Sequence, residues 1–153
     1  MAFGGVSSLA HCHLCTVENA VEGICEEIDL YEAAGIKNMV LHPDMMEESG
    51  LSRAERIERN IQNLRRIADY VKDKDIIICL ENLRPHTPEE TDLIDASADD
   101  LLYLIGRIGS DRFGICLDTG HLNMTLKNQR EFILKAGKKL RALHIANNEG
   151  KTD

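Results

Sequence analysis

Apolar residues along the chain follow two patterns that alternate from residue 16 onward. In the first pattern, apolar residues recur at the 3.6-residue spacing of an amphipathic helix. Ser52 and Glu55 have the spacing of a capping box, and Ser97 is a suitable N-cap for another helical stretch. The pattern predicts four helices, at about residues 17–31, 52–71, 97–108 and 128–136. The first, third and fourth of these are followed by Gly35, Gly109 and Gly137, respectively.

The helix that begins near Ser52 carries an apolar stripe on an otherwise strongly charged segment. We expect this stripe to pack against a sheet while the Arg and Glu side chains of the helix face water. The stripe consists of Ile57, Ile61, Leu64, Ala68 and Val71.

The second pattern is a short run that is apolar at nearly every position, as in IIICL at residues 76–80. A strand with one face in water would alternate, whereas a strand covered on both faces is continuously apolar. Serial strand–helix–strand units give parallel strands joined by right-handed crossovers. The fold class is therefore α/β, with helices on the outer face of a parallel sheet. Four strands are predicted in adjacent positions, near residues 38–42, 76–81, 113–118 and 141–146.

Length and composition fit one globular domain over residues 1–153. The net charge is −8, aromatic residues make up 4%, and there is no block of Lys and Arg, so nucleic-acid binding is not expected. No apolar run approaches the roughly 20 residues that span a bilayer, and the first residues lack a basic leader. The expected location is the cytoplasm, with no membrane partner.

The five cysteines are an odd number in a chain without an export signal, which favours reduced thiols. Cys79 and Cys116 lie inside apolar runs and are expected in the core. Cys12 and Cys15, within HCHLC at residues 11–15, have the spacing of half a zinc knuckle. A structural zinc site needs a second ligand pair, which Cys25 alone does not supply, so we do not favour one.

Residues able to bind a metal or move a proton follow the predicted strands. They are His42, Glu81 and Asp118, with His144 near the end of the last strand. The carboxyl ends of parallel strands lie on one face, where active sites assemble. Taken singly, a histidine here is more often a loop residue, and either carboxylate has an alternative role as a helix cap or turn former.

A carboxylate directly after a buried apolar run is costly unless its charge is compensated. One divalent cation shared by Glu81, Asp118 and His144 would compensate both carboxylates, and we favour this metal site. Two carboxylates and an imidazole suit Mn²⁺, Co²⁺, Mg²⁺ or Zn²⁺, and a thiolate site is disfavoured.

Four segments in chain order resemble the xylose isomerase-like TIM-barrel superfamily, which includes sugar phosphate isomerases and epimerases and the endonuclease IV type of apurinic-site nuclease. LDTGH is the most specific part. The segments are VLHP (40–43), CLENL (79–83), GICLDTGH (114–121) and ALHIANNEGKTD (142–153).

The resemblance implies metal ligands at Glu81, Asp118 and His144. It implies that His121 contacts substrate in the epimerases or a second metal in the nucleases. His42 matches a pocket histidine with the same ambiguity, and His11 matches one on the preceding strand more loosely. For this chain we expect His42 and His121 to bind substrate.

Two features depart from the family pattern. Relatives often have Asp-Asn where this chain has Asn147-Asn148. A typical (β/α)₈ barrel has about 250 residues, so 153 residues are expected to form a partial barrel of about five strands, with the first strand missing. Relatives continue toward an Asp-x-His segment and a final metal-binding glutamate. Open sheet edges would allow two copies to associate.

The resemblance implies a divalent-metal-dependent isomerase or epimerase that acts on a sugar or sugar phosphate. Glu81 is then the acid–base residue that takes the proton α to a carbonyl, and a hydride shift is the family's other route. The alternatives are an apurinic-site nuclease, which would use His11, His42 and His121 as metal ligands, and a barrel fragment without activity.

Overall fold

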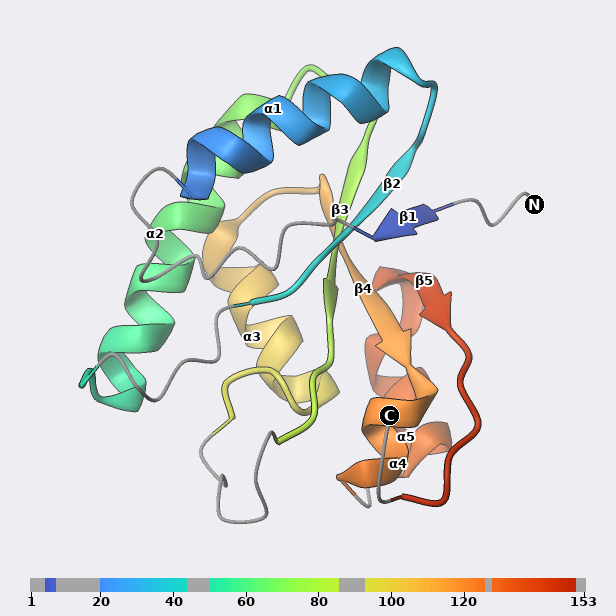
Figure 1. Ribbon diagram of the computed structural model, residues 1–153. Coiled ribbons are helices and arrows are strands. Elements are labelled where there is room, and N and C mark those ends of the chain that lie inside the picture. Colours follow the sequence, from blue (N-terminus) through green and yellow to red (C-terminus); the bar gives the residue numbers. More distant parts are fainter. Residues whose placement is uncertain (1–4, 8–19, 44–49, 86–92, 126–127, 151–153) are drawn as a thin grey trace.

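The computed structural model describes residues 5–7, 20–43, 50–85, 93–125 and 128–150. Five strands form one sheet in the order β1-β2-β3-β4-β5, and every neighbouring pair is parallel (Figure 1). The strands are β1 Gly5–Ser7, β2 Asn38–Leu41, β3 Ile77–Glu81, β4 Phe113–Asp118 and β5 Leu140–His144. The α/β class and the order of the four predicted strands are confirmed. The short strand β1 lies beside β2 and makes the fifth.

Helices alternate with these strands, as the apolar spacing predicts. The Ser52–Glu55 capping box is present with both of its hydrogen bonds, and Ser97 caps the next long helix. That helix ends at Gly109, whose φ of 76° is the left-handed conformation that glycine adopts without strain. The helices are α1 Ala20–Ala33, α2 Arg53–Val71, α3 Ala98–Ile108, α4 Thr119–Met124 and α5 Gln129–Ala136, with a 3₁₀ turn at Gly137–Lys139.

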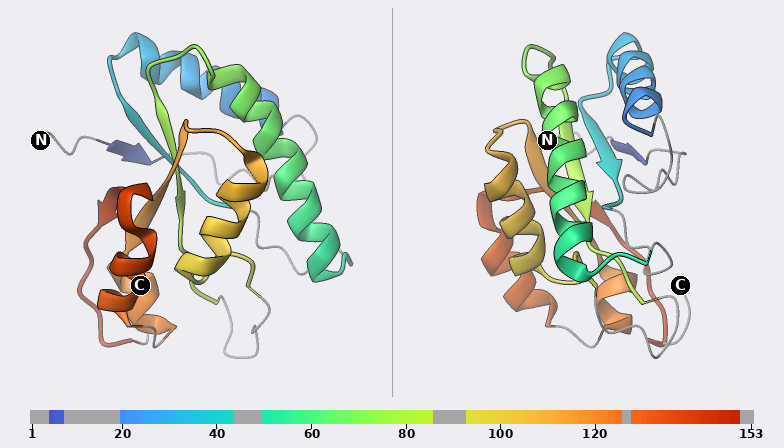
Figure 2. Two further views of the ribbon diagram at one scale, coloured as in Figure 1. Left: turned by 180° about the vertical axis from the view of Figure 1, so that it is seen from behind. Right: turned by 90° about the vertical axis from the view of Figure 1, so that its left-hand side faces the viewer.

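The two faces of the sheet have different coverings. Helices α1, α2, α3 and α5 pack on one face, where they bury the larger hydrophobic core (Figures 1 and 2). Alternate strand residues contribute to that core, among them Met39, Ile78 and Ile115. The intervening residues Val40, Cys79 and Cys116 form a small cluster of their own on the opposite face. We call this opposite face the inner face of the sheet.

Four details differ from the sequence-based expectation. Strand β5 runs from Leu140 to His144 instead of 141–146, so His144 is its last residue. Residues 119–124 form the short helix α4, which is not among the four predicted helices. In α2, Ile57 is only partly buried, and Arg56 is 2% exposed although the charged residues of this helix were expected to face water. The buried part includes the guanidinium nitrogens Nε and Nη1, so these atoms do not reach water.

Candidate metal centre at the carboxyl ends of the strands

The alternation of side chains along each strand places the polar strand-end residues on the inner face. Glu81 lies two residues after Cys79, and Asp118 lies two residues after Cys116. Since residues two apart on a strand share a face, both carboxylates lie on the same side as the cysteine cluster. Glu81 and Cys116 are also direct partners in the register of β3 and β4.

The carboxylate of Glu81 lies at the centre of the cluster, and Glu81 is only 1% exposed. His42 Nε2 lies 3.0 Å from Glu81 Oε2. His144 Nδ1 lies 3.1 Å from Glu81 Oε1, and His121 Nδ1 lies 3.4 Å from the same oxygen. Three imidazoles from three separate parts of the chain therefore surround one buried carboxylate.

Asp118, which is 7% exposed, joins the same cluster. Its Oδ2 lies 3.7 Å from His144 Nδ1 and 4.0 Å from His121 Nδ1. Its other oxygen, Oδ1, accepts a hydrogen bond from the backbone N–H of His121 at 2.9 Å and caps α4. The capping role considered from the sequence is thus real, and it leaves Oδ2 directed at the histidines.

The structure brings together all five site residues expected from the sequence: His42, Glu81, Asp118, His121 and His144. Their roles as metal ligands or substrate contacts stay predictions. His11 and the half knuckle of Cys12 and Cys15 lie outside the described residues.

Asn82 is a positioning residue that sequence analysis did not assign, although it stands in the quoted CLENL segment. Its side chain is fully buried, accepts a hydrogen bond from the Asp118 N–H at 2.8 Å and donates to the Asp118 carbonyl oxygen at 3.1 Å. The Asn82 carbonyl oxygen accepts a bond from His121 Nδ1 at 2.9 Å. Asn82 therefore fixes Asp118 and His121 relative to Glu81, its neighbour in the chain.

The bond between His121 and Asn82 also fixes the tautomer of this histidine. A carbonyl oxygen only accepts hydrogen bonds, so Nδ1 of His121 carries the proton. In the neutral imidazole, Nε2 is then the unprotonated nitrogen, the one able to accept a proton or bind a metal.

Burial and the surrounding histidines act in opposite directions on Glu81. Burial raises the pKa of the carboxyl group, but the hydrogen bond from His42 and the charges of His42, His144 and His121 outweigh it. The net pKa lies below the ordinary value of glutamic acid. The carboxylate is therefore ionised at neutral pH and able to act as a ligand or a proton acceptor.

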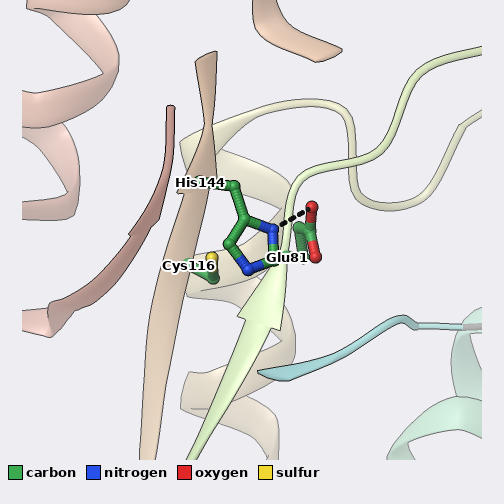
Figure 3. A group of neighbouring side chains, drawn as sticks. All are labelled: Glu81, Cys116 and His144. Carbon is green, nitrogen blue, oxygen red and sulfur yellow. Dashed lines mark hydrogen bonds and ion pairs between the residues drawn. The ribbon is translucent and has the colours of Figure 1, made fainter. Parts of the chain in front are cut away.

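Two overlapping groups of donor atoms have the spacing of a metal site, and both include Glu81. One group adds Asp118 and His121, and the other adds Cys116 and His144. Figure 3 shows the imidazole of His144 directed toward Glu81, with the Cys116 sulfur near the same ring. The pKa of the Cys116 thiol is raised, mainly by burial and further by the charge of Glu81. This disfavours a thiolate. The oxygen and nitrogen donors fit a hard or borderline divalent cation.

A helix-covered parallel sheet with this polar cluster at its carboxyl ends is part of a TIM barrel. The sequence model of the family described as xylose isomerase-like TIM barrel matches residues 5–153. The chain belongs to the xylose isomerase-like TIM-barrel family.

Curated relatives include proteins with two kinds of name. The chain is 34% identical over 109 residues to "Probable endonuclease 4" of Mycoplasma genitalium, an alignment that covers 69% of this chain and 34% of that protein. It is 29% identical over 87 residues to D-psicose 3-epimerase of Enterocloster bolteae, covering 57% of this chain and 28% of that protein. The chain spans less than half the length of the curated relatives that it matches.

Solved structures confirm the partial barrel. A D-tagatose 3-epimerase-like protein superposes with a TM-score of 0.81 at 24% identity, covering 95% of this chain and 57% of that one. A 3-keto-D-glucoside 4-epimerase from E. coli gives a TM-score of 0.81 at 15% identity, covering 94% and 58%. In the described part of the chain, no helix combines the length and apolar character that crossing a membrane requires.

Proposed function

We propose that the chain carries the metal-binding part of a divalent-metal-dependent isomerase or epimerase that acts on a sugar or sugar phosphate. The observation that carries this proposal is the buried Glu81 carboxylate with three imidazoles within 3.4 Å. The second carboxylate, Asp118, contacts two of the same imidazoles. The epimerase names of relatives and structural neighbours support the substrate class.

Glu81, Asp118 and His144 would hold the cation, and their oxygen and nitrogen atoms suit Mn²⁺, Co²⁺, Mg²⁺ or Zn²⁺. A bound divalent cation would act as a Lewis acid toward a sugar carbonyl and its neighbouring hydroxyl. Both carboxylates are themselves buried from water, which strengthens their electrostatic interactions.

Glu81 would also transfer the proton. Its depressed pKa keeps the carboxylate ionised, ready to take the proton from the carbon α to the carbonyl. The electron pair of the broken C–H bond forms the C=C bond of an enediolate, and the negative charge passes to the former carbonyl oxygen. Return of a proton to the same carbon from the opposite face would restore the carbonyl and invert the centre. His121 Nε2 and the His42 imidazole would bind substrate hydroxyl groups.

An apurinic-site nuclease is the second candidate, because curated relatives named "Probable endonuclease 4" reach 34% identity. In that function His42 and His121 would be metal ligands, and an unprotonated Nε2 on His121 is compatible with this role. The net charge of −8 argues against it, since DNA affinity depends on neutralising phosphates.

Metal binding is tested first, by isothermal titration of the chain with Mn²⁺. Combined Glu81→Gln and Asp118→Asn substitutions should abolish binding, while Gln62→Ala on the exposed surface of α2 should not affect it. Undiminished binding by the double variant would mean that the cation binds elsewhere.

The reaction is tested in D₂O with a panel of ketohexoses and their phosphates, on the longest open reading frame that contains this sequence. Proton transfer through Glu81 predicts deuterium at the inverted carbon by NMR, and Glu81→Gln should eliminate it. Interconversion of ketose and aldose without deuterium incorporation would instead favour a hydride shift. Cleavage of an abasic oligonucleotide without sugar turnover would establish the nuclease and refute the epimerase.

A further inference from the structure

The segment that follows β5 is held on helix α4 by side-chain hydrogen bonds. These bonds lie beside the candidate metal centre, and none of them is part of it. We call them the α4 latch. They join Thr119, Gly120 and Asn123 of α4 to Ala146 and Asn148.

Thr119 continues the pairing of β4 with β5 beyond the end of the sheet. The last backbone pair of these strands is Asp118 with His144. The Thr119 hydroxyl then accepts a hydrogen bond from the Ala146 N–H at 3.1 Å and donates one to the Ala146 carbonyl oxygen at 3.0 Å. The Thr119 side chain thus holds the backbone N–H and C=O groups of Ala146, two residues after His144.

Asn148 forms the second half of the latch. Its Nδ2 donates to the Gly120 carbonyl oxygen at 3.2 Å. Its Oδ1 accepts from Asn123 Nδ2 at 2.8 Å and from the Gly150 N–H at 3.0 Å. The Asn148 carbonyl oxygen accepts a further bond from Asn123 Nδ2 at 3.1 Å. All hydrogen-bonding atoms of the Asn148 amide plane are directed at α4 or at its own turn.

Gly120 makes this close approach sterically feasible. A Cβ atom at position 120 would lie 3.0 Å from both Ala146 Cβ and Asn148 Nδ2, and 3.2 Å from Asp118 Oδ1. Ala146, Asn148 and one carboxylate oxygen of the candidate centre therefore all lie around the same side of Gly120.

The position of His144 depends on restraints of this kind. Strand β5 has β4 as its one paired neighbour among the described strands. Leu143 and Ile145, on either side of His144, are 42% and 82% exposed within the described residues. Helix α4 also carries His121, so the latch ties two of the imidazoles around Glu81 to each other.

We propose that Thr119 and Asn148 are positioning residues, which keep His144 in reach of Glu81 and Asp118 for binding of a divalent cation. This inference rests on the proposed function, since it assigns the latch to the same metal centre. It extends that function to two side chains outside the proposed ligand set of Glu81, Asp118 and His144.

Two matched pairs of variants test the latch. Thr119→Val removes the hydroxyl at almost constant shape, and Thr119→Ser retains it. Asn148→Ala removes the amide, and Asn147→Ala changes its exposed neighbour. Thr119→Val and Asn148→Ala should each weaken Mn²⁺ binding by about tenfold and alter the visible spectrum of bound Co²⁺. Thr119→Ser and Asn147→Ala should match the wild type in both measurements.

Unfolding is measured in parallel, because a purely structural latch would lower stability alone. Wild-type affinity and an unchanged Co²⁺ spectrum in Thr119→Val and Asn148→Ala would overturn the proposal. If the wild type binds no Mn²⁺, the proposed function fails, and the latch is judged in the metal-free protein. There the His144 imidazole resonance should shift in both variants, and an unchanged resonance would refute the positioning role.

Discussion

The substitution Asn82→Ala tests how the two central strands hold the candidate centre. It removes the two buried hydrogen bonds between the Asn82 amide and the backbone of Asp118, at 2.8 and 3.1 Å. Each such bond contributes a net 0.5–1.5 kcal/mol, roughly, and a buried N–H left without a partner costs about 1–3 kcal/mol. We therefore expect the free energy of unfolding to fall by about 2–4 kcal/mol.

The measurement is urea unfolding followed by circular dichroism, with Gln62→Ala in the exposed part of α2 as the control. The control should change stability by about 0.5 kcal/mol at most. If Asn82→Ala lowered the free energy of unfolding no more than the control does, water would be replacing the amide at no cost. That result would refute the stabilising role assigned to the two hydrogen bonds. The variant should also weaken Mn²⁺ binding, because Asp118 and His121 both lose the restraint of Asn82.

Three further predictions concern the core, a surface ion pair and the donor set. Ile61→Ala should lower the free energy of unfolding by about 2–5 kcal/mol, because Ile61 is fully buried in the core. A loss below about 0.5 kcal/mol would show that the apolar stripe of helix α2 is not part of the core. The pKa of Asp29 is lowered mainly by the hydrogen bond from Tyr70 and further by the hydrogen bond from Lys74. The ionised carboxylate therefore stabilises the fold at pH values above its unfolded pKa. This stabilisation is lost as the pH falls through the folded pKa. Tyr70→Phe should raise the Asp29 pKa in a carboxyl ¹³C NMR titration, and an unchanged value would contradict the assigned cause. The spectrum of bound Co²⁺ should lack a sulfur charge-transfer band and be insensitive to Cys116→Ser, since the pKa of this thiol is raised; such a band would assign Cys116 as a ligand.

Much of the architecture follows from short-range patterns. The capping box at Ser52, the N-cap at Ser97 and the stop at Gly109 involve residues within four positions of one another, so the local sequence determines them. The polar residues after three apolar runs predicted the end of the sheet at which the site lies. Because parallel strands share their carboxyl ends, this inference needed no knowledge of register.

The inner face could not be assigned in the same way. A run such as IIICL is apolar on both faces, so its sequence does not indicate which residues face the helices and which face the site. The same limitation explains the shift of β5 to Leu140–His144, since ALHIA contains no signal for its pairing with β4.

Contacts between distant segments were decided by the tertiary structure alone. Asn82 and Asp118 are 36 residues apart, and His42 and Glu81 are 39 apart. Each meets its partner because the register of the strands places both at one edge of the sheet. The sequence by itself determined which residues can act as ligands and at which end of the strands they lie. The tertiary structure decided that Glu81 lies at the centre of the cluster, because only strand pairing and the alternation of faces bring three imidazoles to one carboxylate.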